Sequence, residues 1–239
     1  MLRLGAFLLL WGLSTAHAQS VVRVGFYDFP PLLTTNTQGA PDGPLRRFTE
    51  TSLTQAGFSG EYKVMPSARL YAGLKSGEVE LWIGAFNRPE LEAYVLETRH
   101  TLAELKLNLY YPADRPTPRL PKDLSGKNLI VLSGYSYCPE VYSKVLNPKH
   151  GAIQLRTSTH QAAVELLARG RGDFLLNYER PTKSLARSDY PALKALPLGQ
   201  YPVKFVISKA SPKAHQLQQA LDNTYIKRVY SGQSVRIEP

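Results

Sequence analysis

The sequence contains one cysteine, Cys138, in 239 residues, so no intramolecular disulfide can form and the fold depends on a packed core. No pattern places a histidine beside that thiol, and we interpret Cys138 as a small, partly buried side chain. The five histidines show no metal-ligand spacing. Neither a phosphate-binding glycine loop nor a G-x-S-x-G turn is present. These absences argue against cysteine-based, metal-dependent and nucleotide-dependent enzymes, and we expect no cofactor.

Long apolar runs are also missing, apart from one run at residues 4–13 that is too short to cross a bilayer comfortably. That run follows Arg3 and precedes Ala16-His17-Ala18, which is the layout of a secretory signal peptide. We predict that residues 1–18 are this peptide, with cleavage before Gln19; a retained N-terminal anchor is the alternative. The expected product is an exported, periplasmic protein without stable membrane insertion.

The sequence has no block of basic residues, although its net charge is positive. Loss of Arg3 with the signal peptide leaves 28 Lys and Arg against 19 Asp and Glu, a net charge of +9. The cations are scattered, with short pairs such as Arg46-Arg47 and Lys227-Arg228. A scattered distribution is typical of an ordinary basic surface, and together with export it argues against a nucleic-acid partner.

Strand and helix patterns alternate along the chain in two similar blocks. Leu45, Phe48 and Leu53 share one helical face, whereas "VELWIGAF" is a continuous apolar run typical of a buried strand. Alternation of this kind predicts βαβ units and a mostly parallel sheet. The expected strands are 21–27, 62–65, 79–86, 128–134, 152–156 and 173–177, and the expected helices are 44–58, 67–77, 140–146, 160–170 and 211–232.

Two extended segments, 105–112 and 201–208, connect these blocks, one in each direction. A double crossing predicts a hinge between two lobes, with a cleft where strand C-termini and helix N-termini converge. Ligands of α/β proteins bind in such crevices. About 220 residues after the signal peptide are enough for one or two cores of this kind.

Four stretches in this order, "VRVGFYDFPP", "SGEVELWIGAFNRPE", "DLSGKNLIVLSGYSY" and "LLARGRGDFLLNYE", resemble the family 3 extracellular solute-binding proteins of bacterial ABC importers. The resemblance covers essentially the whole exported chain. It implies an α/β, two-lobed type II periplasmic-binding-protein fold that closes on a small ligand. The expected lobes are 19–110 and 202–239 for the first and 111–201 for the second. The implied partners of this monomer are a polar, anionic or amino-acid-like small molecule and an ABC permease.

The resemblance implies an arginine that grips the ligand's carboxylate, and in this sequence that position holds Leu91. Arg88, three residues earlier, could reach the same cleft from another angle. Arg69 is the second candidate, because a cation at the start of a helix is not favoured by the helix dipole. Arginine suits this role, since its planar guanidinium binds carboxylates in a bidentate manner. An ordinary salt bridge is the alternative for each.

In the second lobe, the resemblance implies an aspartate that pairs with the ligand's ammonium group, and Tyr178 stands at that position. Glu179 follows and could supply the charge, or it could be an ordinary acidic residue in the first turn of the next helix. Both halves of an amino-acid clamp therefore depart from the family pattern.

Aromatic and polar residues remain at the strand ends where the family lines its pocket. We expect Tyr27, Phe29, Phe86 and Tyr135 to form walls and Ser136 to supply a polar contact. Trp82 is expected in the strand core.

Two other functions stay open at this point. A few proteins of this fold resemble dehydratases, which need a placed acid or base, but Asp28, Glu140 and Glu179 show no catalytic spacing. The second alternative is a sensory or accessory module that presents its closed form to a protein partner. Import and sensing share the step in which ligand stabilises one conformation.

Overall fold

The structure, a computed structural model, describes residues 20–85 and 89–237. The predicted signal peptide and two predicted site residues, Phe86 and Arg88, lie outside the described residues. Within the described ranges, no helix is both long and apolar enough to cross a membrane.

The helices and strands follow the expected alternation, with additional short elements. The strands are β1 (Ser20–Phe26), β2 (Thr34–Thr35), β3 (Pro41–Asp42), β4 (Phe58–Val64), β5 (Leu81–Ala85), β6 (Val95–Glu97), β7 (Ala103–Pro112), β8 (Asn128–Leu132), β9 (Ile153–Thr157), β10 (Phe174–Tyr178) and β11 (Leu193–Ser208). The helices are α1 (Pro44–Gln55), α2 (Ser67–Ser76), α3 (Pro89–Glu92), α4 (Pro139–Val141), α5 (His160–Ala168), α6 (Glu179–Leu185) and α7 (Ala214–Tyr230), with a π-helical turn at Tyr142–Leu146 and short 3-10 turns at Lys122–Leu124 and Pro148–His150.

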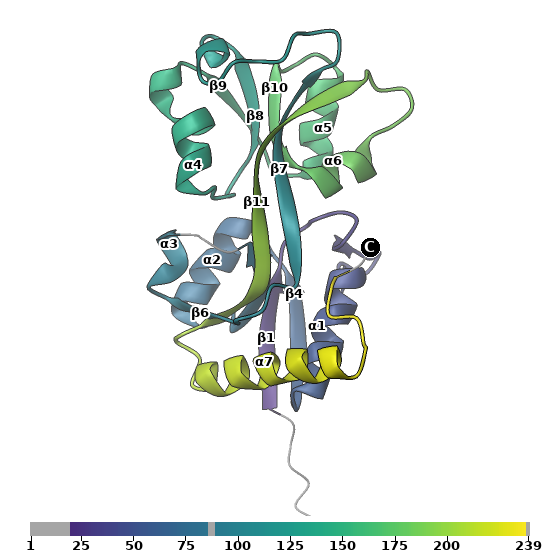
Figure 1. The fold of residues 1–239 in the computed structure, drawn as a ribbon, viewed down its shortest axis with the longest axis vertical. Helices are drawn as coiled ribbons and strands as arrows, with labels where there is room; N and C mark the ends of the chain where they lie inside the picture. Colours follow the sequence, from purple (N-terminus) through teal and green to yellow (C-terminus); the bar gives the residue numbers. More distant parts are fainter. Residues whose placement is uncertain (1–19, 86–88, 238–239) are drawn as a thin grey trace, which may run out of the picture.

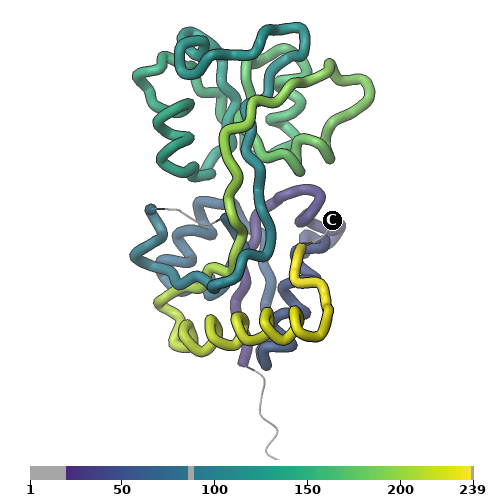
Figure 2. The backbone as a smooth tube through the Cα atoms, viewed as in Figure 1, coloured from purple at the N-terminus to yellow at the C-terminus, as the bar shows by residue number. Residues whose placement is uncertain are grey.

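Two lobes lie along the long axis of the molecule, and β7 and β11 run between them (Figure 1). The same view as a tube shows these two strands side by side through the waist (Figure 2), and they pair in antiparallel fashion from Ala103 to Pro112. Both predicted crossings are therefore present, although β11 begins earlier than expected, at Leu193. The first lobe contains elements from both ends of the chain, whereas the second is formed by the middle.

The main sheet has the strand order β4-β1-β5-β11-β7-β10-β8-β9, with β6 paired to β11. The pairs β1–β4, β1–β5, β8–β9 and β8–β10 are parallel, as predicted. The hinge strands are different: β11 is antiparallel to β5 and β7, and β10 is antiparallel to β7. A strand that returns between the lobes runs against its neighbour. The sheet is therefore mixed, with parallel pairs in the outer part of each lobe and antiparallel pairs around β7 and β11, and it is less parallel than predicted.

Helix ends explain how the chain turns into the cleft. Gly43 has a φ of 120°, and a Cβ there would lie 2.5 Å from the Leu32 carbonyl oxygen, so the residue before Pro44 and α1 has to be glycine. Gly77, with a φ of 84°, ends α2 as predicted. Thr159 caps α5, since its side chain accepts a hydrogen bond from the Ala162 N–H over 3.1 Å. The N-termini of α2 and α5 both reach the space between the lobes.

One apolar core extends from the first lobe through the waist into the second. It includes Phe26 and Phe29 of the first lobe together with Leu129 and Tyr178 of the second. A separate cluster lies under α2 and α3, where Trp82 is 2% exposed as predicted, and packs with Leu70, Leu74 and Leu91. The lobes thus meet through apolar contacts, with the cleft residues at the junction.

Candidate functional site: the cleft between the lobes

Two pockets open at the junction of the lobes, and Tyr27 lines both. The wide pocket, about 940 Å³ including its open part, takes Asp28 and residues 64–68 from the first lobe and residues 132–135 and 158–160 from the second. The Trp82 pocket, about 480 Å³ including its open part, lies among β5, β7, β11 and the N-terminal part of α1. Tyr27 therefore lies between two pockets of the predicted cleft.

The lobes touch across the wide pocket at Gly134. Its φ of 74° places the turn after β8 against the start of α2, where a Cβ would lie 2.8 Å from Ser67 Oγ and 3.2 Å from the Ala68 nitrogen. A side chain at this position would push the lobes apart. Gly134 therefore permits the closed arrangement.

Four predicted pocket residues come together as an aromatic cluster that bridges the lobes. The ring centroids of Tyr27 and Tyr135 are 5.1 Å apart, and those of Phe29 and Tyr178 are 5.5 Å apart. Phe29 and Tyr178 are 5% and 3% exposed and belong to the core; Phe29 lines the Trp82 pocket, whereas Tyr178 lines neither pocket. Tyr27 and Tyr135 border the wide pocket. Ser136, next along the chain, is partly buried.

A buried histidine, His160, lies at the centre of this cluster and was missed by the sequence reasoning. It is 1% exposed, its ring meets Phe29 edge-on at 5.4 Å, and its Nε2 lies 2.9 Å from the Tyr135 hydroxyl. Its Nδ1 lies 2.8 Å from Asn177 Oδ1. Because the amide oxygen only accepts, Nδ1 carries the proton and Nε2 accepts from Tyr135. Burial lowers the pKa of His160 to about 4, against the opposing hydrogen bond to Asn177, so the ring is neutral.

The predicted charged contacts have partners elsewhere. Arg69 lies on α2 with its side chain 68% exposed and its Nη2 3.4 Å from Glu78 Oε1, and it does not line the wide pocket. Glu179 starts α6 and accepts a hydrogen bond over 2.7 Å from Lys183, which lowers the pKa of its carboxyl group. Both side chains therefore make ordinary surface ion pairs in this conformation.

Leu91, at the position where the family resemblance implies an arginine, is a core residue. It is 2% exposed and packs in the cluster under α2 and α3. Cys138 is buried as predicted, and its thiol donates a hydrogen bond over 2.9 Å to the hydroxyl of Tyr201. Neither residue is available to a ligand in the cleft.

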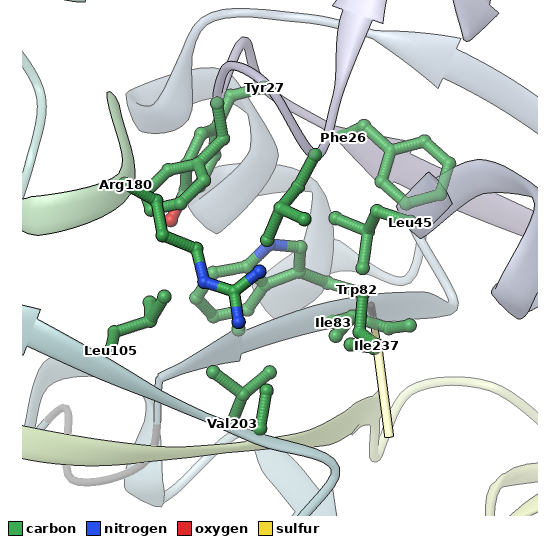
Figure 3. A pocket seen from close by; sticks show the side chains of 13 residues that line it. Phe26, Tyr27, Leu45, Trp82, Ile83, Leu105, Arg180, Val203 and Ile237 are labelled. Atoms are coloured by element: carbon green, nitrogen blue, oxygen red, sulfur yellow. The ribbon is translucent and has the colours of Figure 1, made fainter. Parts of the chain in front are cut away.

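An arginine that the sequence reasoning did not select, Arg180, reaches into the Trp82 pocket. It is the second residue of α6, in the other lobe, and its guanidinium points among Trp82, Leu105 and Val203 (Figure 3). Its Nη1 atom is buried and has no hydrogen-bond partner among the described residues. The signal in the sequence is faint, because an arginine beside a proline in a first helical turn has no characteristic pattern.

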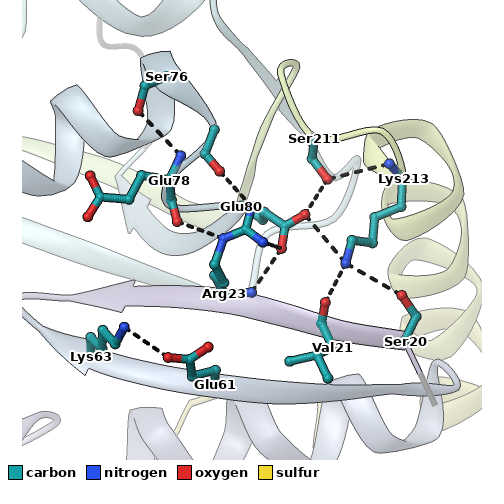
Figure 4. Close-up of polar contacts among 11 residues, drawn as sticks. Ser20, Val21, Arg23, Glu61, Lys63, Ser76, Glu78, Glu80, Ser211 and Lys213 are labelled. Carbon is teal, nitrogen blue, oxygen red and sulfur yellow. Dashed lines mark hydrogen bonds and ion pairs between the residues drawn. The ribbon is translucent and has the colours of Figure 1, made fainter. Parts of the chain in front are cut away.

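A second group of charges lies away from the cleft, around Glu80, which is 1% exposed (Figure 4). Glu80 Oε1 accepts from Ser211 over 2.7 Å and lies 3.4 Å from Lys213 Nζ. Its Oε2 accepts from the Arg23 backbone over 3.1 Å and lies 3.3 Å from Arg23 Nη1. Burial raises the pKa of Glu80, but these hydrogen bonds and cations outweigh burial and lower it. Every oxygen is engaged, so this carboxylate connects β1, β5 and the start of α7.

Searches for similar proteins found matches in structure alone: no protein-family model matches the sequence, and no curated protein matches it. An ancestral arginine-binding protein bound to arginine superimposes with a TM-score of 0.72 at 18% identity, covering 90% of this chain and 97% of that one. A histidine kinase sensor domain with similarity to periplasmic binding proteins also scores 0.72, at 17% identity, covering 90% and 92%.

The chain has the type II periplasmic-binding-protein fold. That is the fold implied by the order of the four sequence stretches. A third similar structure, the ancestral amino acid-binding protein AncCDT-1, a precursor of cyclohexadienyl dehydratase, scores 0.70 at 15% identity over 90% of this chain and 92% of that one. At these identities the likeness establishes the periplasmic-binding fold, with its two lobes and hinge strands.

This periplasmic-binding fold shows why some cleft residues were found from sequence and others were not. Tyr27 directly follows β1, and Tyr135 comes three residues after the end of β8; in parallel sheets, ligand clefts lie at such C-terminal strand ends. His160 and Arg180 both lie at helix starts of the second lobe, and only the packing of the two lobes brings His160 against Phe29 and Arg180 into the Trp82 pocket. No group of three or more His, Cys, Asp or Glu side chains suited to a metal ion occurs among the described residues.

Proposed function

We propose that this protein is a periplasmic solute-binding protein that captures a small polar, anionic or amino-acid-like molecule between its lobes for import by an ABC permease. The observation that supports this most directly is the wide pocket, which encloses about 420 Å³ and to which both lobes contribute residues. Pockets for small molecules typically occupy about 300–1,000 Å³. A ligand that contacts both lobes stabilises the closed state by its differential affinity for that state.

Within this pocket, we assign ligand contact to Tyr27 and Tyr135, which face each other from the two lobes. Aromatic faces attract flat groups and cations, and phenolic hydroxyls give polar contacts. The start of α5, capped by Thr159, adds backbone N–H groups at the rim. We expect the protein to act as an exported monomer and to perform no chemistry on its ligand.

Sensing is the second function that a specific observation favours, since one similar structure is a histidine kinase sensor domain. Both roles use the same closure and differ in the protein that recognises the closed form. A pull-down with the cognate permease, compared with one using a membrane-bound kinase, separates them.

The test of solute binding is a thermal-shift screen of residues 19–239 against amino acids, polyamines, dicarboxylates and small aromatic acids. Binding at a hundredfold excess over Kd adds about 2.7 kcal/mol of stability, which raises the Tm by about 5–10 °C for a chain of this size. A Tyr27→Ala variant should lose most of the shift. An exposed control, Tyr142→Ala, should keep it. Absence of any shift across the whole panel would contradict solute capture.

A further inference from the structure

The guanidinium of Arg180 lies in the Trp82 pocket and forms no ion pair with any residue that the structure describes. Thirteen of the described residues line this pocket, and among them Arg180 is the one with a charged side chain; Phe26, Leu45 and Ile83 are typical of the others. Among the described residues, no carboxylate oxygen lies within 4.0 Å of the guanidinium, whereas the neighbouring Glu179 pairs with Lys183. The buried Nη1 of this guanidinium therefore has no hydrogen-bond acceptor among the described residues.

Local structure does not account for this placement. A cation in the first turn of α6 lies at the positive end of the helix dipole and gains nothing from it. A buried donor left unpaired costs about 1–3 kcal/mol, and a charged one costs more. A solvent-exposed rotamer would avoid that cost. Geometry and energetics together indicate that an anion belongs opposite Arg180.

The walls of the pocket indicate what accompanies the anion. Trp82 presents its indole over Gly84, since a Cβ on that glycine would lie 1.9 Å from the indole ring. Leu105 and Val203, from the two hinge strands, close the opposite side. Such a lining suits a ring or a branched hydrocarbon, because apolar surface gains about 25 cal/mol per Å² when it leaves water. Polar ligand groups have few partners there.

We propose that Arg180 anchors the carboxylate of a ligand whose apolar ring occupies the Trp82 pocket, so that the preferred ligands are aromatic or alicyclic monocarboxylic acids. This inference rests on the proposed function and names the ligand class for that same cleft. The second lobe supplies the cation and the first lobe supplies the apolar wall. Bidentate binding to the guanidinium then draws α6 toward β5.

The chain provides its own probe for this test. Of its two tryptophans, Trp11 lies in the predicted signal peptide, so a protein of residues 19–239 reports fluorescence from Trp82 alone. We would titrate this protein with 3-phenylpropionate, with the neutral 3-phenylpropionamide and with the cationic 3-phenylpropylamine. The acid should bind at least about tenfold more tightly than the amide, because a hydrogen bond to a charged group contributes about 1.5–3 kcal/mol. The amine should bind weakest.

Variants identify the cation responsible. Arg180→Gln should weaken 3-phenylpropionate by about tenfold or more and leave the amide unchanged, and Arg180→Lys should recover part of the loss, since lysine keeps the charge without the fork. Arg171→Gln, which removes an exposed arginine of the same lobe, is the matched control and should bind as wild type does. Thermal melts of each variant separate loss of binding from loss of folding.

The outcomes test the Arg180 assignment and the proposed solute capture separately. Equal affinity for acid and amide, or an unchanged acid affinity in Arg180→Gln, overturns the assignment of Arg180 while solute capture stands on any other ligand of the wider panel. Absence of binding by every compound in that panel contradicts the proposed function, and the Arg180 inference fails with it.

Discussion

The buried imidazole of His160 makes the stability of the folded protein depend on pH in a defined direction. Its pKa falls from an ordinary 6.5 to about 4 because burial penalises the charged ring. Between these values the unfolded chain binds the proton and the folded chain does not. The contribution of His160 is therefore complete above about pH 6.5, declines as the pH falls toward 4, and stays constant below that.

The size of the effect follows from the same shift. A difference of one pKa unit corresponds to 1.36 kcal/mol, so the move from 6.5 to about 4 corresponds to about 3 kcal/mol of unfolding free energy. The surroundings explain why protonation of the ring is costly: Phe29 meets the ring edge-on, and both ring nitrogens already form hydrogen bonds, to Tyr135 and Asn177. A charged ring would need Nε2 to donate where it now accepts.

The assay is urea unfolding at about pH 7.5 and at about pH 4.5 for wild type, His160→Gln and His215→Gln, where His215 is an exposed control on α7. Other carboxyl groups titrate in the same window, so the informative quantity is the difference between variants. Wild type and His215→Gln should both lose about 2–3 kcal/mol more than His160→Gln does. Equal losses in all three proteins would refute the placement of a neutral, buried histidine at the waist.

Three further substitutions test other parts of the structure. Glu80→Gln should destabilise the protein by about 2–4 kcal/mol in urea unfolding, because it removes the charge of a buried carboxylate that pairs with Arg23 and Lys213, whereas Glu61→Gln, an exposed carboxylate on β4, should remain near wild type. Gly134→Ala and Gly126→Ala impose the same backbone strain, at φ values of 74° and 69°. The new methyl group meets the opposite lobe at position 134 and has open space at position 126, so only Gly134→Ala should increase the radius of gyration in X-ray scattering. Leu91→Arg, which restores the residue type that the family resemblance implies, should cost more than about 4 kcal/mol, and an unchanged Tm would show that this position is not core.

Periodicity was sufficient for the elements whose apolar pattern is long. The helix after Gly43 and the strands in each lobe were predicted because their side chains repeat at helical or strand spacing. The two-residue strands β2 and β3 and the four-residue helix α3 are too short to carry a period. The antiparallel pairing at the waist was missed because pairing direction depends on which strands become neighbours in space.

The candidate site divides in the same way. Tyr27 and Tyr135 were found because each follows a strand end, and position alone identifies such residues. His160 and Arg180 were missed, since the properties that matter are the neutral ring of His160 and the buried Nη1 of Arg180, which has no hydrogen-bond partner in the described part of the chain. Those properties arise from burial between segments far apart in sequence, and they become visible only when both lobes are in place.

The passage of the chain through the waist, out along β7 and back along β11, has a consequence for folding order. Strand β11 pairs with β5, and α7 then packs on the first lobe, so the first lobe lacks a central strand and a helix until the last part of the chain is present. The second lobe is one uninterrupted segment between the two crossings. Contacts within an uninterrupted segment close shorter loops and form faster. The second lobe should therefore form as the early folding unit. C-terminal truncations after Tyr201 keep the part of β11 that pairs with β7 in this lobe, so they should leave the second lobe intact while the first lobe stays unfolded.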